Sequence, residues 1–258
     1  MLRFVVLGSG SKGNAVLVMS RQAKILIDCG FSLKRLRERV SDAGLSLDGL
    51  DAVFVTHEHG DHIHGLGVLA RAIDVPVYVT QNTFKAFPDR VGNVPCVHHF
   101  ESGDSMHLKD MEIVSFQTSH DAKDPVSFTV NSAGAKIGFA TDLGYVTQLV
   151  RTRLAGCHGL VLEANHCPDM LRNGHYPAQL QQRIRSRMGH LSNQDMSSLL
   201  SQLLHDDLQT VVLYHLSESN NCPDLVRSMA KRVVRDQPSI QLHIAAQDKV
   251  SPVFEVRP

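Results

Sequence analysis

The sequence has no tryptophan and only four tyrosines in 258 residues. Exposed aromatic rings on which unpaired bases stack are therefore scarce, which disfavours a dedicated single-strand-binding surface. An excess of either charge is also absent, since 26 basic residues balance 26 acidic residues. The net charge thus gives no general attraction to nucleic acid or to a membrane surface, and any attraction to a polyanion has to be local.

Long apolar runs are missing as well. The longest, such as residues 4–7 and 211–213, have the length of a strand and are far too short to span a membrane. Residues 1–8 lack the charged start and long apolar stretch of a secretory signal. The five cysteines include no C-x-x-C pair, and their odd number is typical of a reducing compartment. We therefore expect a cytoplasmic protein with no membrane partner, and the sequence identifies no stable protein partner.

Hydrophobic residues make up 43% of the chain, enough for one large core, and no linker or repeat interrupts it. We therefore expect a single domain over residues 1–258. Apolar patterning predicts strands at residues 3–7, 15–19, 24–28, 52–55, 77–80, 112–117, 126–131, 136–140, 160–163, 211–214, 241–245 and 253–256, and helices at residues 33–43, 64–73, 178–187, 193–205 and 224–234. Strands with interspersed helices are typical of an α/β layered sandwich.

The segment LGSGSKGN, residues 7–14, has the G-x-G-x-x-G spacing of a dinucleotide-binding turn, formed by Gly8, Gly10 and Gly13. A dinucleotide site needs a helix directly after the glycines, because the helix N-terminus holds the pyrophosphate. A strand-like run follows here instead. We therefore interpret the segment as a hairpin loop in which the glycines and Asn14 take positive φ. Ser11 and Asn14 are candidate substrate contacts in this loop.

Histidine is abundant, with 15 residues, and several of them gather in THEHGDH directly after an apolar strand. In an extended segment His57 and His59 point to the same side. Gly60 permits a sharp turn, which brings Asp61 and His62 toward the same volume. Imidazole and carboxylate ligands suit Zn²⁺, Fe²⁺ or Mn²⁺, so the motif predicts a metal site. The alternative is a polar loop that happens to be rich in histidine.

This motif resembles the His-x-His-x-Asp-His signature of the metallo-β-lactamase superfamily. The resemblance implies an αββα four-layer sandwich of α/β class with a metal site at one edge of the sheets. It also supplies further landmarks in chain order, each after a predicted strand: Asp28, His120, Asp142 and His215. Asp142 alone also suits the cap of a helix over residues 144–149.

By the resemblance, the chain holds two divalent ions, Zn²⁺ or Mn²⁺ with iron as a further option. One ion is assigned to His57, His59 and His120, the other to Asp61, His62 and His215, with Asp142 bridging and Asp28 orienting the ligands from behind. The best-known β-lactamases carry a cysteine ligand where this chain has Asp142. That difference disfavours antibiotic hydrolysis and favours the phosphodiesterase and thioesterase branches.

Residues 162–193 and 215–221 resemble the YycJ (WalJ) branch, which is related to the phosphodiesterases that process transfer-RNA ends. The resemblance implies that Glu163 and His190 act together in proton transfer. The alternative is a hydrogen bond that only stabilises a crossover. Relatives often carry Asp where this chain has Cys167, and the roles of Cys167 and of the neighbouring His166 stay open.

Two further segments bear on the substrate. The stretch 170–194 contains four arginines, Arg172, Arg183, Arg185 and Arg187, and no acidic residue, which suits either nucleic-acid phosphates or an ordinary solvated helix face. In HLSESNN, Ser217 and Asn220 suit either phosphate contacts or the cap of the helix that follows.

Together these features predict a dinuclear metal-dependent hydrolase that cleaves phosphodiester bonds, by resemblance a DNA exonuclease. Asp61 would orient the attacking water, and His190 with Glu163 would protonate the leaving oxygen. The alternatives are a thioesterase or lactonase of a small acyl substrate, and a protein whose ions are purely structural. DNA versus RNA, strand polarity, exonuclease versus endonuclease and oligomeric state are not determined by the sequence.

Overall fold

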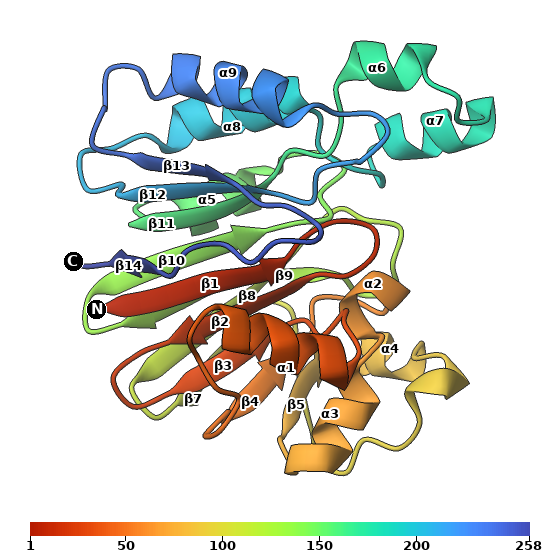
Figure 1. Ribbon diagram of the computed structural model, residues 1–258, viewed down its shortest axis with the longest axis vertical. Helices are drawn as coiled ribbons and strands as arrows, with labels where there is room; N and C mark the ends of the chain where they lie inside the picture. The colour runs from red at the N-terminus through yellow and green to blue at the C-terminus, as the bar shows by residue number, and fades with distance from the viewer.

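The computed structural model describes residues 1–258 as two seven-stranded sheets that pack face to face, with helices on both outer faces (Figure 1). The first sheet has the order β14 (Phe254–Val256), β1 (Leu2–Gly8), β2 (Ala15–Met19), β3 (Lys24–Ile27), β4 (Ala52–Phe54), β5 (Val77–Thr80), β6 (Val97–Phe100). The second has the order β13 (Gln241–Ile244), β12 (Thr210–Tyr214), β11 (Gly159–Glu163), β10 (Ala135–Ala140), β9 (Val126–Ser132), β8 (Met111–Gln117), β7 (Ser105–Leu108).

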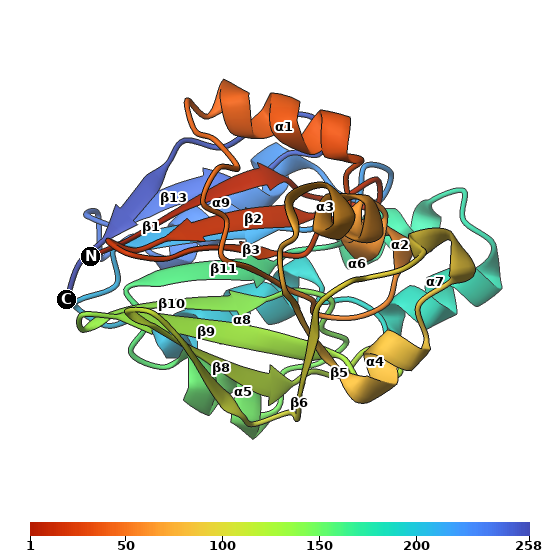
Figure 2. The same ribbon diagram turned by 90° about the horizontal axis from the view of Figure 1, so that it is seen from below.

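The helices are α1 (Leu33–Asp42), α2 (Gly60–Ile63), α3 (Leu66–Ile73), α4 (Gln81–Lys85), α5 (Gln148–Leu154), α6 (Pro168–Asn173), α7 (Ala178–Arg185), α8 (Asn193–Leu203) and α9 (Pro223–Val233), with a 3₁₀ turn at Asp89–Val91. Helices α1 and α3 pack on the first sheet and α5, α8 and α9 on the second (Figures 1 and 2). None of the helices is long and apolar enough to cross a membrane. The four-layer αββα sandwich is as predicted.

Three apolar layers hold the sandwich together. The central layer lies between the sheets and contains fully buried aromatic rings from both of them, such as Phe54 and Phe128, whose centroids are 5.7 Å apart in an edge-on arrangement. The outer layers join each sheet to its helices. Each buried aromatic side chain removes about 150–250 Å² from water, so burial of these layers is the main stabilising term.

Each sheet is half antiparallel and half parallel. Strands β3, β4, β5 and β6 are parallel in the first sheet, and β10, β11, β12 and β13 are parallel in the second. The carboxyl ends of parallel strands meet at one edge, where α/β proteins generally place their ligands. Helices α6 and α7 project beyond the strands at this edge (Figures 1 and 2).

The glycine-rich segment is a hairpin loop between the antiparallel strands β1 and β2, as predicted. Only Gly10 and Gly13 take positive φ, at 139° and 150°, so the prediction is wrong for Gly8 and Asn14. Gly8 is needed for another reason, because a Cβ there would lie 2.6 Å from the ring of Phe31.

The structure corrects several predicted elements. The helix expected at residues 64–73 is α3, which begins two residues later, at Leu66, and a short helix that was not predicted, α2, precedes it. Between them lies Gly65, where a Cβ would be 1.9 Å from the carbonyl oxygen of Phe31. No helix starts at residue 144. Helix α5 begins at Gln148 and is capped by the side chain of Thr147, so Asp142 is not a helix cap. Strands β6 and β7 were not predicted, because each has only four residues, two of them polar, and both are partly exposed.

Candidate metal centre

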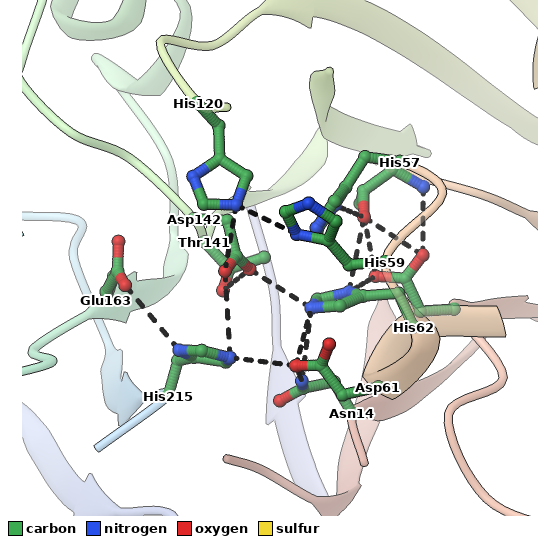
Figure 3. A network of polar contacts seen from close by, with 12 residues as sticks. Asn14, His57, His59, Asp61, His62, His120, Thr141, Asp142, Glu163 and His215 are labelled. Carbon is green, nitrogen blue, oxygen red and sulfur yellow. Dashed lines mark hydrogen bonds and ion pairs between the residues drawn. The ribbon is translucent and has the colours of Figure 1, made fainter. Parts of the chain in front are cut away.

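All seven predicted metal ligands lie at the edge where the carboxyl ends of the strands meet. From the first sheet, the loop after β4 contributes His57, His59, Asp61 and His62, the last two on α2. From the second sheet, β8, β10 and β12 are followed by His120, Asp142 and His215. Segments more than 150 residues apart in the chain thus converge on one cluster (Figure 3).

The backbone is strained where three of the site residues leave their strands. Asp28, Asp142 and His215 have φ values of 60°, 53° and 57°, in the left-handed region that side chains other than glycine rarely adopt. Each such residue costs on the order of 1 kcal/mol or more and persists only where surrounding contacts hold it. The strain turns these side chains toward the common edge.

The first predicted ligand group is assembled. Suitable donor atoms of His57, His59 and His120 all lie within 4.8 Å of one another. His59 Nδ1 and His120 Nε2 are 3.2 Å apart. Tetrahedral zinc with Zn–N bonds of about 2.0–2.1 Å requires ligand atoms about 3.3 Å apart, which agrees with this spacing. His57 Nε2 is buried and has no hydrogen-bond partner, so a cation in the group would satisfy it.

The second group, Asp61, His62 and His215, is assembled in the same way. Asp61 Oδ2 lies 3.3 Å from His215 Nε2 and 3.4 Å from His62 Nε2. Asp142 stands between the groups: its Oδ2 is 3.2 Å from His62 Nε2, and its Oδ1 is 3.8 Å from His120 Nε2. The donor set therefore fits divalent cations, and Asp142 lies between the two ligand groups (Figure 3).

Outer hydrogen bonds fix which ring nitrogen faces the cluster. His62 Nδ1 donates to Asp28 Oδ2 at 2.7 Å, and Asp28 also accepts from the amide and hydroxyl of Thr56. His120 Nδ1 donates to the carbonyl of Gly189 at 3.0 Å. In both rings Nε2 is then the nitrogen that faces the cluster, the orientation that metal-binding histidines require. Asp28 thus lies behind His62, where the sequence placed it.

The charged groups of the cluster shift one another's pKa values: the carboxylates raise those of His62 and His215, and the histidines lower those of the carboxylates. Burial disfavours the charged form of Asp142, but the neighbouring charges of His215 and His62 outweigh this and hold its pKa well below the usual value. The pKa of Asp61 is lowered in the same way by His62 and His215. Burial, with the charge of His62, lowers the pKa of His57 well below normal, so its ring is neutral and free to bind.

Asn14 holds Asp61 from the glycine loop. Its side chain is fully buried: Nδ2 donates to Asp61 Oδ2 at 3.0 Å and to the Gly10 carbonyl at 3.1 Å, while Oδ1 accepts from the Gly10 amide at 2.9 Å. The backbone amide of Asn14 donates to the Asp61 carbonyl at 2.8 Å. A Cβ on Gly30 would lie 1.8 Å from that carbonyl oxygen, so glycine is required there. The side-chain amide of Asn14 is thus engaged with Asp61 and Gly10, and a contact of Asn14 with substrate stays a prediction.

The other three predicted substrate contacts differ in whether they line the pocket. Ser11 and Ser217 line the pocket above the cluster. Asn220 does not: it is fully buried, with both side-chain polar atoms unpaired, and a Cβ on Gly174 would touch its Oδ1 at 2.6 Å. A contact of Asn220 with substrate therefore also stays a prediction.

The pocket has a volume of about 370 Å³. It is lined by Ser11, His59, Gly60, Asp61, Asp121, Asp142, Asn165, Tyr176, Leu180, Arg183, Ile184, Gly189, His190, His215 and Ser217. Sequence reasoning missed Asp121, Asn165, Tyr176, Leu180 and Ile184. The spacing of four between Tyr176, Leu180 and Ile184 is visible in the sequence, but it resembles that of an ordinary core-facing helix.

Glu163 and His190 form the predicted pair. His190 Nδ1 donates to Glu163 Oε1 at 2.7 Å, and Glu163 Oε2 accepts from the amide of Leu143 at 2.7 Å. Burial tends to lower the pKa of His190, but the charge and hydrogen bond of Glu163 outweigh this and raise the pKa above normal. Glu163 therefore favours the protonated form of this ring at the pocket wall.

The four arginines of residues 170–194 do not form one free basic surface. Arg172 pairs with Asp169, just before that stretch, and Arg183 pairs with Asp121. The guanidinium of Arg187 lies 4.2 Å from the centre of the Tyr145 ring. Of the four, Arg183 alone lines the pocket.

His166 and Cys167, the two residues whose roles the sequence does not determine, are both buried. Cys167 precedes α6 at its N-cap position, and all five cysteines are unpaired. His166 is 3% exposed, its Nδ1 has no hydrogen-bond partner, and burial lowers its pKa to about 4. Neither side chain lines the pocket.

The two facing sheets, their outer helices and a histidine- and aspartate-rich edge define a metal-binding protein of the metallo-β-lactamase fold. The family described as "Beta-lactamase superfamily domain" matches residues 23–216, and the chain belongs to this superfamily. It is 37% identical over 238 residues to exodeoxyribonuclease YycJ of Bacillus anthracis, covering 92% of this chain and 90% of that protein.

The chain also matches a second relative over nearly its whole length. Exodeoxyribonuclease WalJ of Streptococcus pneumoniae is 32% identical over 263 residues, with 98% of each chain covered. Among solved structures, the metallo-β-lactamase fold protein YhfI from Bacillus subtilis superposes with a TM-score of 0.73 at 18% identity, over 97% of this chain and 99% of that one. That likeness concerns the fold alone.

Proposed function

We propose that this protein is a dinuclear metal-dependent exodeoxyribonuclease. The observation that carries the proposal is the pairing of two ligand groups, which share Asp142, with a hydrogen-bonded Glu163–His190 pair in one pocket. The nearly full-length similarity to relatives named exodeoxyribonuclease supports DNA as the substrate. Five unpaired cysteines fit a cytoplasmic location.

The proposed ion ligands are His57, His59 and His120 for one site and Asp61, His62 and His215 for the other, with Asp142 shared. This set has no thiolate and suits Zn²⁺ and Mn²⁺ alike. Divalent ions in such a site supply a nucleophilic water near neutral pH and offset negative charge on a phosphate.

The protein's own groups position the reaction. The Asp61 carboxylate, ionised and held by Asn14, orients the attacking water toward phosphorus. His190 keeps Nδ1 bonded to Glu163, so Nε2 is the nitrogen that gives its proton to the leaving oxygen. Glu163 remains ionised throughout and favours the imidazolium that makes this donation possible.

End-labelled single-stranded and duplex DNA, incubated with Mn²⁺ beside a thioester and a lactone, tests the proposed function. We expect release of mononucleotides from DNA and two ions per chain in metal analysis. His62→Ala should abolish turnover, whereas His64→Ala, an exposed histidine two residues further on, should not. Turnover of the thioester or lactone alone would refute the proposal, and so would full DNA cleavage by His62→Ala.

A further inference from the structure

One wall of the pocket differs from the rest. Of the 15 lining residues only three are hydrophobic, and all three, Tyr176, Leu180 and Ile184, come from α7 and the residues just before it. Leu180 and Ile184, four residues apart, lie on one face of α7, and Tyr176 directly precedes its N-cap residue, Pro177. No residue of α7 is buried, so this apolar stripe has no partner in the core and faces the pocket instead.

The stripe is fixed relative to the metal centre. The amide of His190 donates to the Ile184 carbonyl at 3.0 Å, and Arg183 pairs with Asp121, the residue after the proposed ligand His120. The amide of Asp121 in turn donates to the carbonyl of Met188, just beyond α7, at 3.0 Å. These bonds connect the C-terminal end of α7 to the loop that carries His120. They therefore fix the distance between the apolar residues and the ligand groups.

The rest of the lining is polar or glycine. Ser11 comes from the glycine loop and Ser217 from the loop after β12, and members of both ligand groups also line the pocket. The pocket therefore combines ionic and apolar lining within about 370 Å³, near the lower end of the range for small-ligand sites. A nucleotide has the same division, because its phosphate is charged and its base is planar and largely apolar on both faces.

We propose that the Tyr176–Leu180–Ile184 stripe is the platform on which the terminal base of the DNA stacks while its phosphate lies at the metal centre. This inference rests on the proposed function and names the part of the substrate that the pocket recognises. The stripe offers ring and aliphatic surfaces rather than an array of hydrogen-bonding groups, so it binds any base face without reading its edge. Digestion is then tolerant of sequence but dependent on the presence of a base.

The test compares DNA oligomers that end in an ordinary nucleotide with the same oligomers ending in an abasic residue, labelled for digestion from either end. Stacking on one aromatic side chain contributes about 1–3 kcal/mol, which corresponds to roughly 5- to 150-fold in affinity. Tyr176→Ala should raise KM by this factor for the ordinary end and leave the abasic end unchanged. Gln182→Ala, on the exposed side of the same helix, is the matched control and should change neither.

A binding measurement gives a second readout that needs no turnover. 2-Aminopurine as the terminal base should lose fluorescence on binding to a His190→Ala variant, and Tyr176→Ala in that background should abolish the quenching. Equal KM effects on both kinds of end, or no quenching while the wild type digests DNA, would overturn the platform alone. The wild type could instead leave DNA intact and hydrolyse a thioester, with a KM that Tyr176→Ala changes. That result would overturn the platform together with the proposed function.

Discussion

Replacement of Asn14 by alanine should weaken metal binding without removing any ligand. The side chain is fully buried, and its Nδ2 donates to the Asp61 oxygen that faces His62 and His215. Without that bond Asp61 is free to rotate away from the two histidines. Loss of a group that orients a metal ligand typically reduces metal affinity about 10- to 100-fold.

The expected size follows from linkage. An ion that binds 10- to 100-fold more weakly stabilises the folded state by about 1.4–2.7 kcal/mol less when metal is in excess. For a domain of this size about 1 kcal/mol shifts Tm by roughly 2–4 °C. The rise in Tm that added Zn²⁺ or Mn²⁺ produces should therefore be smaller in Asn14→Ala by about 3–10 °C. The metal-free variant should also melt earlier, because the amide and carbonyl of Gly10 lose their partner.

The assay is thermal unfolding with and without metal, alongside competition with a chromophoric chelator. Asn220→Ala is the matched control, because Asn220 is equally buried and its side chain makes no hydrogen bond. We expect the control to keep the full metal-induced rise. If Asn14→Ala lowers both Tm values by the same amount, its role is confined to the loop and the reasoning about Asp61 is refuted.

Two further predictions concern protonation. Glu163→Gln removes the charge that raises the pKa of His190. The alkaline limb of the pH profile of kcat should therefore move to lower pH, and kcat should fall by a factor of about 10²–10⁴. An alkaline limb that does not move would contradict the role assigned to Glu163. His166 has its pKa lowered to about 4, against about 6.5 when unfolded, so the folded protein loses stability as pH falls through this interval. Denaturant titration of His166→Leu should therefore show about 2 kcal/mol less loss than wild type between pH 7.5 and pH 5, and equal losses would refute this.

The metal centre was largely predictable because its signals are local. THEHGDH follows an apolar strand, and strand periodicity with one glycine suffices to gather four ligand side chains. His120, Asp142 and His215 each follow a strand that the apolar pattern reveals. Their convergence at one edge was inferred from resemblance, because pairwise patterns do not indicate which strands become neighbours in the two sheets.

What the sequence could not show depends on long-range packing. The bond from Asn14 to Asp61 joins residues 47 positions apart, and nothing in the glycine motif indicates it. The partner of Arg183 is Asp121, 62 positions away, so the local charge of residues 170–194 was misleading. The stripe on α7 has the spacing of a core helix, and only the fold shows that it projects from the edge of the sheets (Figure 1).

The two ligand groups also differ in when they can be completed during synthesis. All ligands of the first group have been synthesised once the chain reaches residue 120. The ligands of the second group are complete only at residue 215, after nearly the whole second sheet has been synthesised. The growing chain therefore contains every ligand of the first group long before His215 is made. His120 nevertheless gains the carbonyl that orients its ring, that of Gly189, only when most of the second sheet has been synthesised.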